Sequence, residues 1–290
     1  LKFANQSMDC STLDYIHNHK TAALFVASGS AAAIIGDATT EQIVALEKYA
    51  SNLGFAFQIL DDLLDVTGNE KEVGEAIRNF GIKREEVFIT TKLWNDDMRK
   101  GRAEAAFEES LKRLGTDYVD LYLLHWPVAG KFIESWKVLE NLYKQKRIRA
   151  IGVSNFHKHH MEALLKEAEI VPAVNQIERH PLLSQKELIE YCTHQGIAVE
   201  AYSPLGSTGA PILREETVVE LARKYDRTPA QIVLKWNIEQ GVIVIPKSTH
   251  KERILSNGQL DFMLRGEDIK MLDALNENKR IMADPENFNF

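Results

Sequence analysis

Short apolar runs alternate with amphipathic stretches through most of the chain after about residue 68. The apolar runs predict strands near 87–92, 119–124, 149–153, 173–177, 197–201 and 242–245. The amphipathic stretches predict helices near 102–114, 133–146, 158–168, 185–195, 214–240 and 266–277. Strands that alternate with helices pair in parallel through right-handed crossovers. The pattern therefore predicts an α/β fold built on a parallel sheet.

Local signals mark two helix ends. Residues 70–80 are typical of a helix that Gly81 closes. The stretch Thr228-Pro229-Ala230-Gln231 combines a capping box with a proline at the first helical position, so it predicts a break within 214–240.

Side chains able to do chemistry stand where the predicted strands end. The clearest case is V-D-L-Y-L-L-H-W-P at 119–127, an apolar strand followed by His125. The corresponding residues on the other strands are Lys92, Ser154, Asn155, Asn175, Gln176, Tyr202, Lys247 and Ser248. Functional groups gather at the carboxyl ends of the strands in a parallel barrel, so we expect the site there.

The strand count differs from that of a complete barrel. A closed barrel of this type has eight strands, and the pattern supplies six. Residues 1–66 give no strand signal; they predict helices near 11–19 and 21–35 and a long amphipathic helix after the capping box at 39–42. We therefore expect a partial (β/α)8 TIM-type barrel that lacks its first two strands and is preceded by an all-α segment.

Composition narrows the classes of function. The formal net charge is −7, which argues against a nucleic-acid or anionic-membrane partner. The two cysteines, Cys10 and Cys192, form neither a disulfide framework nor a zinc-ligand pattern, so we expect a cytoplasmic protein. The apolar stretch Ala22–Ile35 is too short to span a bilayer.

Residues 68–290 resemble the aldo-keto reductase family, in its bacterial diketo-gluconate or glyoxal reductase branch. The motifs that carry the resemblance are G-N-E-K-E-V-G-E-A-I, F-I-T-T-K-L-W, D-Y-V-D-L-Y-L-L-H-W-P, I-R-A-I-G-V-S-N-F, V-N-Q-I-E, A-Y-S-P-L-G and V-I-P-K-S-T-H-K-E-R-I. The resemblance implies a barrel that reduces aldehydes and ketones with NADPH.

Residues 1–67 resemble trans-prenyl diphosphate synthases, which make geranylgeranyl and longer polyprenyl diphosphates. Y-I-H-N-H-K-T-A-A-L-F and G-F-A-F-Q-I-L-D-D-L-L-D-V-T-G carry this second resemblance. We interpret the chain as a fusion or recombinant product, with a helical segment at 1–67 and a barrel portion at 68–290.

The reductase resemblance assigns two catalytic residues. It makes Lys92 the lysine that lowers the pKa of the family's proton-donating tyrosine, and His125 the histidine that orients the carbonyl. Taken singly, Lys92 could instead belong to a structural ion pair and His125 could be a buried core histidine. Thr67 occupies the position of the tyrosine, and an alkyl hydroxyl is a far weaker acid than a phenol. We therefore expect impaired carbonyl reduction. Asp62 falls at the spacing of the family's aspartate, a match that we interpret as coincidence.

The same resemblance assigns a binding site for NADPH. The implied cofactor residues are Ser154, Asn155, Gln176, Tyr202, Ser203, Leu205, Gly206, Lys247, Ser248, Arg253 and Asn257. Within this set, Lys247, Ser248 and Arg253 would hold the 2′-phosphate, since two cations and a hydroxyl suit a dianion. The alternative for the two cations is a solvated charged surface. Trp94 and Trp126 imply an apolar pocket for a small carbonyl substrate.

Three hypotheses for function remain open. The first is an impaired NADPH-dependent reductase, and the second is a non-catalytic protein that keeps at most NADPH affinity. The third is residual binding of an isoprenoid diphosphate through Mg²⁺ held by Asp61, Asp62 and Asp65, which could equally form a solvated acidic surface. Open sheet edges also predict self-association unless other segments cover them.

Overall fold

A computed structural model describes residues 70–207, 209–248 and 250–288. The chain divides into two compact units. One comprises Ile89–Lys247 and Phe262–Phe290, and the other comprises Leu1–Phe88 and Ser248–Asp261. The predictions for residues 1–69 lie outside the described residues.

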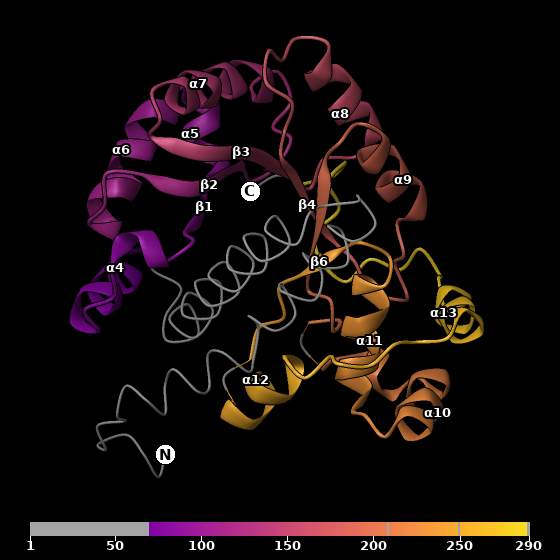
Figure 1. Cartoon of the computed structure of the whole chain (residues 1–290). Helices are drawn as coiled ribbons and strands as arrows, with labels where there is room; N and C mark the ends of the chain where they lie inside the picture. Colours follow the sequence, from indigo (N-terminus) through magenta and orange to yellow (C-terminus); the bar gives the residue numbers. More distant parts are fainter. Residues whose placement is uncertain (1–69, 208, 249, 289–290) are drawn as a thin grey trace, which may run out of the picture. The chain divides into compact units, whose positions relative to one another are not determined.

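The larger unit is built on a parallel sheet, as the sequence predicts (Figure 1). Within the described residues its six strands follow chain order, and each pairs in parallel with the next. They are β1 (Thr90–Leu93), β2 (Val119–Leu124), β3 (Ile148–Ser154), β4 (Val174–Glu178), β5 (Ala198–Tyr202) and β6 (Ile243–Val244). Each lies at or within a few residues of its predicted position.

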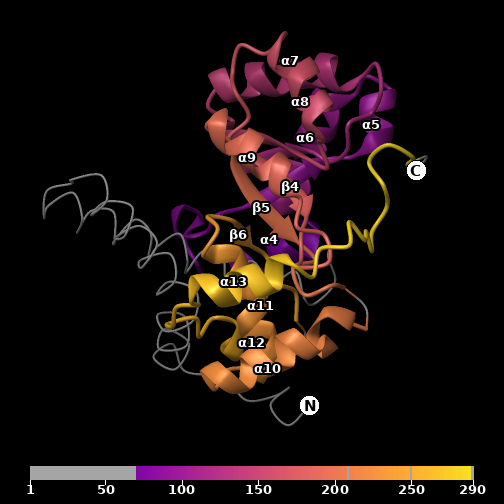
Figure 2. The same ribbon diagram turned by 90° about the vertical axis from the view of Figure 1, so that its right-hand side faces the viewer.

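Helices pack on the outer side of the curved sheet, as Figures 1 and 2 show. They are α5 (Asn95–Arg99), α6 (Ala103–Leu114), α7 (Phe132–Lys144), α8 (Lys158–Leu165) and α9 (Lys186–His194). The packing is aromatic where α6 meets β2, because the rings of Phe107 and Tyr122 lie edge to face with centroids 5.1 Å apart. Every residue of β2 is buried, including Asp120. The Asp120 carboxylate accepts hydrogen bonds from the Ile89 backbone N–H and from Arg149, so its burial is compensated.

Four helical elements of this unit contribute to a second hydrophobic core. They are η2 (Pro211–Arg214), α10 (Glu216–Tyr225), α11 (Pro229–Ile238) and α13 (Gly266–Asp273). It is made of buried apolar side chains that include Ile212, Val218, Leu221, Trp236 and Leu272. The predicted break between α10 and α11 is confirmed. Thr228 Oγ1 accepts from the Gln231 N–H at 3.2 Å, and Gln231 Oε1 accepts from the Thr228 N–H at 2.8 Å.

The described part of the other unit contains α4 (Glu70–Asn79), η1 (Arg84–Glu86) and α12 (Lys251–Asn257). Gly81 follows α4 with a left-handed backbone (φ 65°), and its N–H donates to the Arg78 carbonyl, so the predicted helix end is confirmed. The pattern did not predict α12. Among the described residues, no helix has the length and apolar character needed to cross a membrane.

Candidate functional site

The parallel register brings the predicted residues together at the carboxyl ends of the strands. Lys92 is the third residue of β1, and His125 directly follows β2. Ser154 is the last residue of β3 and pairs in register with Gln176 of β4. Tyr202 ends β5 and pairs with Glu178 at the end of β4. These carboxyl ends are where the sequence predicts the site.

Asn155 joins three strand ends through its side chain. Its amide nitrogen donates to the His125 carbonyl at 3.0 Å and lies 3.2 Å from Ser154 Oγ. Its amide oxygen accepts from the Tyr202 hydroxyl at 2.7 Å. The residue is buried and has a left-handed backbone (φ 65°), which asparagine tolerates better than most residues. Asn155 therefore fixes the orientation of the Tyr202 ring relative to β2 and β3.

A second hydrogen-bonded chain runs through Ser154 and Gln176. The Ser154 hydroxyl donates to the Gln176 carbonyl at 3.0 Å, and the Asn155 N–H donates to the same carbonyl at 2.9 Å. The Gln176 amide nitrogen donates to the carboxylate of Glu200, a buried residue in the middle of β5. The neighbouring Asn175 also points away from solvent and donates to the Phe156 carbonyl.

Burial lowers the pKa of both candidate catalytic groups. It lowers the pKa of Lys92, although the nearby Glu200 carboxylate acts in the opposite direction. Burial, reinforced by the Lys92 charge, lowers the pKa of His125 to about 4. His125 is therefore neutral at pH 7 and keeps one ring N–H that can donate a hydrogen bond.

Aromatic rings surround His125. The Trp94 ring lies edge to face against it at 4.9 Å, and the Trp126 ring lies 6.3 Å from it. Trp126 is buried, whereas 44% of Trp94 is exposed. Phe288, near the end of the chain, packs against Trp126 with ring centroids 5.0 Å apart. The predicted substrate residues thus form an apolar surface beside the histidine.

The loop after β5 contains three further predicted cofactor residues. Ser203 has a left-handed backbone (φ 48°), and its carbonyl accepts from the Gly206 N–H at 2.9 Å. Gly206 itself has φ 82°, and a Cβ there would lie 3.2 Å from Ile212. Leu205 packs against the second apolar core. The loop is therefore a tight turn that the core holds in place.

The remaining predicted cofactor residues divide between the two units. Lys247 is exposed at the end of its segment in the larger unit, three residues after β6. Ser248, Arg253 and Asn257 belong to the other unit, the last two on α12. Within that unit, Ser248 Oγ accepts from the His250 N–H, Arg253 is exposed and Asn257 is half-buried. Asp61, Asp62, Asp65 and Thr67 lie outside the described residues.

The sequence analysis did not identify two acidic residues near these strand ends, Glu200 in the middle of β5 and Glu178 at the end of β4. Glu200 is the buried carboxyl group that accepts from Gln176, and burial raises its pKa, whereas Gln176 and Lys92 act in the opposite direction. Burial alone would raise the pKa of Glu178, but hydrogen bonds from His180 and from the backbone of Ile281 and Met282 hold it below its usual value. Glu200 could have been identified from the sequence, because it is the one charged residue of the otherwise apolar strand β5. The contacts of Glu178 depend on a segment about one hundred residues away.

The Tyr202 hydroxyl stays protonated at neutral pH. Burial raises the pKa of Tyr202, and the Glu178 carboxylate raises it further, while Arg280 acts in the opposite direction. A protonated phenol can donate to Asn155 Oδ1, as the structure shows.

Two family models match the chain. The model of the aldo/keto reductase family matches residues 65–277, and that of polyprenyl synthetase matches residues 1–79. Both resemblances inferred from the motifs are thereby confirmed.

Relatives and solved structures agree with the match of residues 65–277 to the aldo/keto reductase family. The chain is 51% identical over 234 residues to the uncharacterized oxidoreductase YtbE of Bacillus subtilis, covering 79% of this chain and 83% of that protein. It is 48% identical over 230 residues to glyoxal reductase of the same organism, with 79% and 83% covered. A crystal structure of a Bombyx mori aldo-keto reductase in complex with NADP superposes with a TM-score of 0.70 at 38% identity, covering 80% of this chain and 85% of that one. The chain belongs to the aldo/keto reductase family.

Proposed function

We propose that the protein reduces small aldehydes and ketones with NADPH, at a rate limited by the loss of its proton-donating tyrosine. Family membership and the glyoxal reductase relative support the reaction class, and the NADP-bound structural neighbour supports the cofactor. The observation that carries the proposal is the hydrogen-bonded network in which Asn155 links His125 to Tyr202.

The side chains at the strand ends suit a nicotinamide ring. The carboxamide of nicotinamide needs both donors and acceptors, and the Ser154 hydroxyl with the amides of Asn155 and Gln176 offers both. Tyr202 offers a flat aromatic face whose orientation is fixed by its hydrogen bond to Asn155. Lys247, a cation of the 2′-phosphate assignment, is exposed in the larger unit and suits a dianion.

When bound, the cofactor would supply a hydride to the carbonyl carbon, and the carbonyl oxygen would take up a proton. Neutral His125 can donate its ring N–H to the carbonyl oxygen and so orient the substrate. Lys92, whose side chain comes from β1, would stabilise negative charge that develops on that oxygen. Thr67 supplies no phenol at the tyrosine position, so protonation falls to a weaker donor. Losing a general acid costs a rate factor of ~10²–10⁴.

The aromatic surface beside His125 suits a small carbonyl compound. Trp94 and Trp126 place aromatic rings beside the histidine. We propose glyoxal-type carbonyls as substrates, in line with the glyoxal reductase relative. We further propose that the barrel is partial, because the two opening strands of the family are replaced by the polyprenyl-synthetase-like segment.

An Asn155→Ala substitution tests the cofactor assignment. Removing the amide frees the Tyr202 ring and removes a donor from the site, so we expect the Kd for NADPH to rise about tenfold, or about 1.4 kcal/mol. Fluorescence titration of NADPH into the full chain measures it.

Asn278→Ala is the matched control. Asn278 is exposed and also has a left-handed backbone (φ 52°), so both substitutions carry similar backbone strain. If Asn155→Ala and Asn278→Ala bound NADPH with equal affinity, the assignment of Asn155 to the cofactor site would be wrong.

The alternatives make different predictions in the same assays. A non-catalytic protein would bind NADPH without oxidising it in the presence of glyoxal. Residual binding of an isoprenoid diphosphate rests on Asp61, Asp62 and Asp65, which lie outside the described residues, and it stays a prediction.

A further inference from the structure

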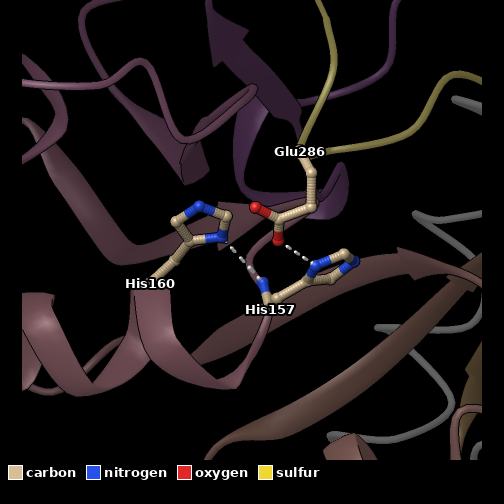
Figure 3. A group of neighbouring side chains, drawn as sticks. All are labelled: His157, His160 and Glu286. Carbon is tan, nitrogen blue, oxygen red and sulfur yellow. Dashed lines mark hydrogen bonds and ion pairs between the residues drawn. The ribbon is translucent and has the colours of Figure 1, made fainter.

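Two histidines and a carboxylate converge outside the strand-end site. His157 is the N-cap residue of α8, His160 lies in the first turn of that helix, and Glu286 comes from the segment at the end of the chain. Figure 3 shows the three side chains pointing toward one another. Each offers a ligand atom, and these atoms lie within 4.8 Å of one another. The proposed reductase reaction uses none of the three residues.

The contacts within this cluster are short and direct. His157 Nδ1 lies 2.6 Å from Glu286 Oε1, and His160 Nδ1 accepts from the His157 backbone N–H at 3.2 Å. Glu286 is 43% exposed and His157 is 25% exposed, so an ion can reach the cluster from solvent. His159 adds a third imidazole at the rim, with Nε2 3.5 Å from the same carboxylate oxygen.

We propose that His157, His160 and Glu286 bind a divalent transition-metal ion of the Zn²⁺ class. Two imidazoles and one carboxylate suit Zn²⁺, Co²⁺ and Ni²⁺, whereas Mg²⁺ and Ca²⁺ prefer all-oxygen sites. Ligand atoms about 2.1 Å from a tetrahedral ion stand about 3.4 Å apart, so His157 Nδ1 and Glu286 Oε1, which lie 2.6 Å apart, must separate when the ion binds.

The charges around the cluster both favour and oppose a cation. Glu286 supplies a carboxylate ligand, which favours a cation. A metal bound at His157 Nδ1 moves the ring proton to Nε2, so the contact of Nε2 with Arg280 has to break. Arg280 opposes binding, because its Nη2 lies 3.3 Å from His157 Nε2. Its other contact, with Glu178, gives the guanidinium an alternative partner when the ion enters.

The ion would tie the C-terminal segment to the start of α8. Glu286 is the only ligand from that segment among the three residues, and Phe288, two residues later, packs on Trp126. Metal binding therefore slows the opening of residues 284–288. This consequence is independent of catalysis and can be measured in the absence of NADPH.

Calorimetric titration of ZnSO₄ into the untagged full chain at pH 7.5 tests the site. We expect one Zn²⁺ that is lost from His157→Ala and weakened in Glu286→Gln. Loss of a residue that merely supports a ligand costs about 10–100-fold in metal affinity, so losing a ligand is expected to cost at least about 100-fold. Glu286→Gln keeps the shape of an exposed side chain, so it tests the site even if His157→Ala fails to fold.

His194→Ala is the matched control. His194 is an exposed histidine at the end of α9 whose ring contacts the Glu190 carbonyl, and its loss should leave Zn²⁺ affinity unchanged. Hydrogen exchange is the second readout, and Zn²⁺ should slow exchange at residues 284–288 in the parent and in His194→Ala only. The proposal would be overturned if the parent did not bind Zn²⁺ or if Glu286→Gln bound it with unchanged affinity. It would also be overturned if Zn²⁺ left hydrogen exchange at residues 284–288 of the parent unchanged.

Discussion

His125 shows how one residue's surroundings set its chemistry. Its ring lies edge to face against Trp94 and 6.3 Å from the Trp126 ring, and its backbone is fixed by hydrogen bonds with Leu93 and Asn155. Burial and the charge of Lys92 lower its pKa to about 4. A neutral histidine suits the role of hydrogen-bond donor to a carbonyl, and the same shift makes folding sensitive to acid.

The lowered pKa of His125 predicts a loss of stability in acid. Unfolding raises this pKa from about 4 to 6.5, so the unfolded state binds more protons between these values. The loss of folding free energy due to His125 is absent above pH 6.5. It grows as the pH falls to about 4, where it levels off at about 3 kcal/mol.

A His125→Gln variant removes this dependence. Urea unfolding at pH 7 and pH 4.5 measures it, and the parent should lose about 2–3 kcal/mol more than the variant. His160 has a similarly low pKa but is present in both proteins, so its effect cancels. If the two proteins lost the same stability between these pH values, His125 would titrate normally in the folded state.

Among the elements, β3 and β4 approach closely at a single glycine. A Cβ on Gly152 would lie 2.7 Å from both Leu123 Cδ2 and the Val174 carbonyl oxygen. One of these neighbours is backbone and cannot move without disturbing β4. The close approach carries Ser154 and Gln176 into register two residues further along.

Gly152→Ala should therefore destabilise the protein by about 1–3 kcal/mol, the usual cost of overpacking. Chemical denaturation measures the change. Gly266→Ala is the control, because Gly266 has no atom within 4 Å of an added Cβ and opens α13, where alanine is well accommodated. A stability for Gly152→Ala equal to that of Gly266→Ala would mean that the two strands have room to separate.

The elements also show what the sequence could and could not predict. The six strands, the end of α4 at Gly81 and the capping box of α11 were predictable because they depend on local pattern and local hydrogen bonds. The strand-end position of His125, Asn155 and Tyr202 follows from the same pattern. The short helices α5 and α12 gave no clear periodicity. The contacts of Glu178 and of Glu286 join segments more than one hundred residues apart, which no local pattern reveals.

On the scale of the whole molecule, the chain combines matches to two families. Residues 65–277 match the aldo/keto reductase model and residues 1–79 match the polyprenyl synthetase model. Within the described residues, β1 and β6 each pair with one neighbour only. The predicted domain boundary at 67–68, and self-association through open sheet edges, stay predictions.

The central claim is that the cofactor site is retained while the proton donor is lost. The most direct test is the single-turnover rate of NADPH oxidation by glyoxal, measured with the parent and with Thr67→Tyr at saturating NADPH. We predict slow oxidation by the parent and a rise of at least about tenfold in the variant, within the ~10²–10⁴ range of a general acid. Equal rates in the two proteins, with NADPH bound to both, would contradict the account.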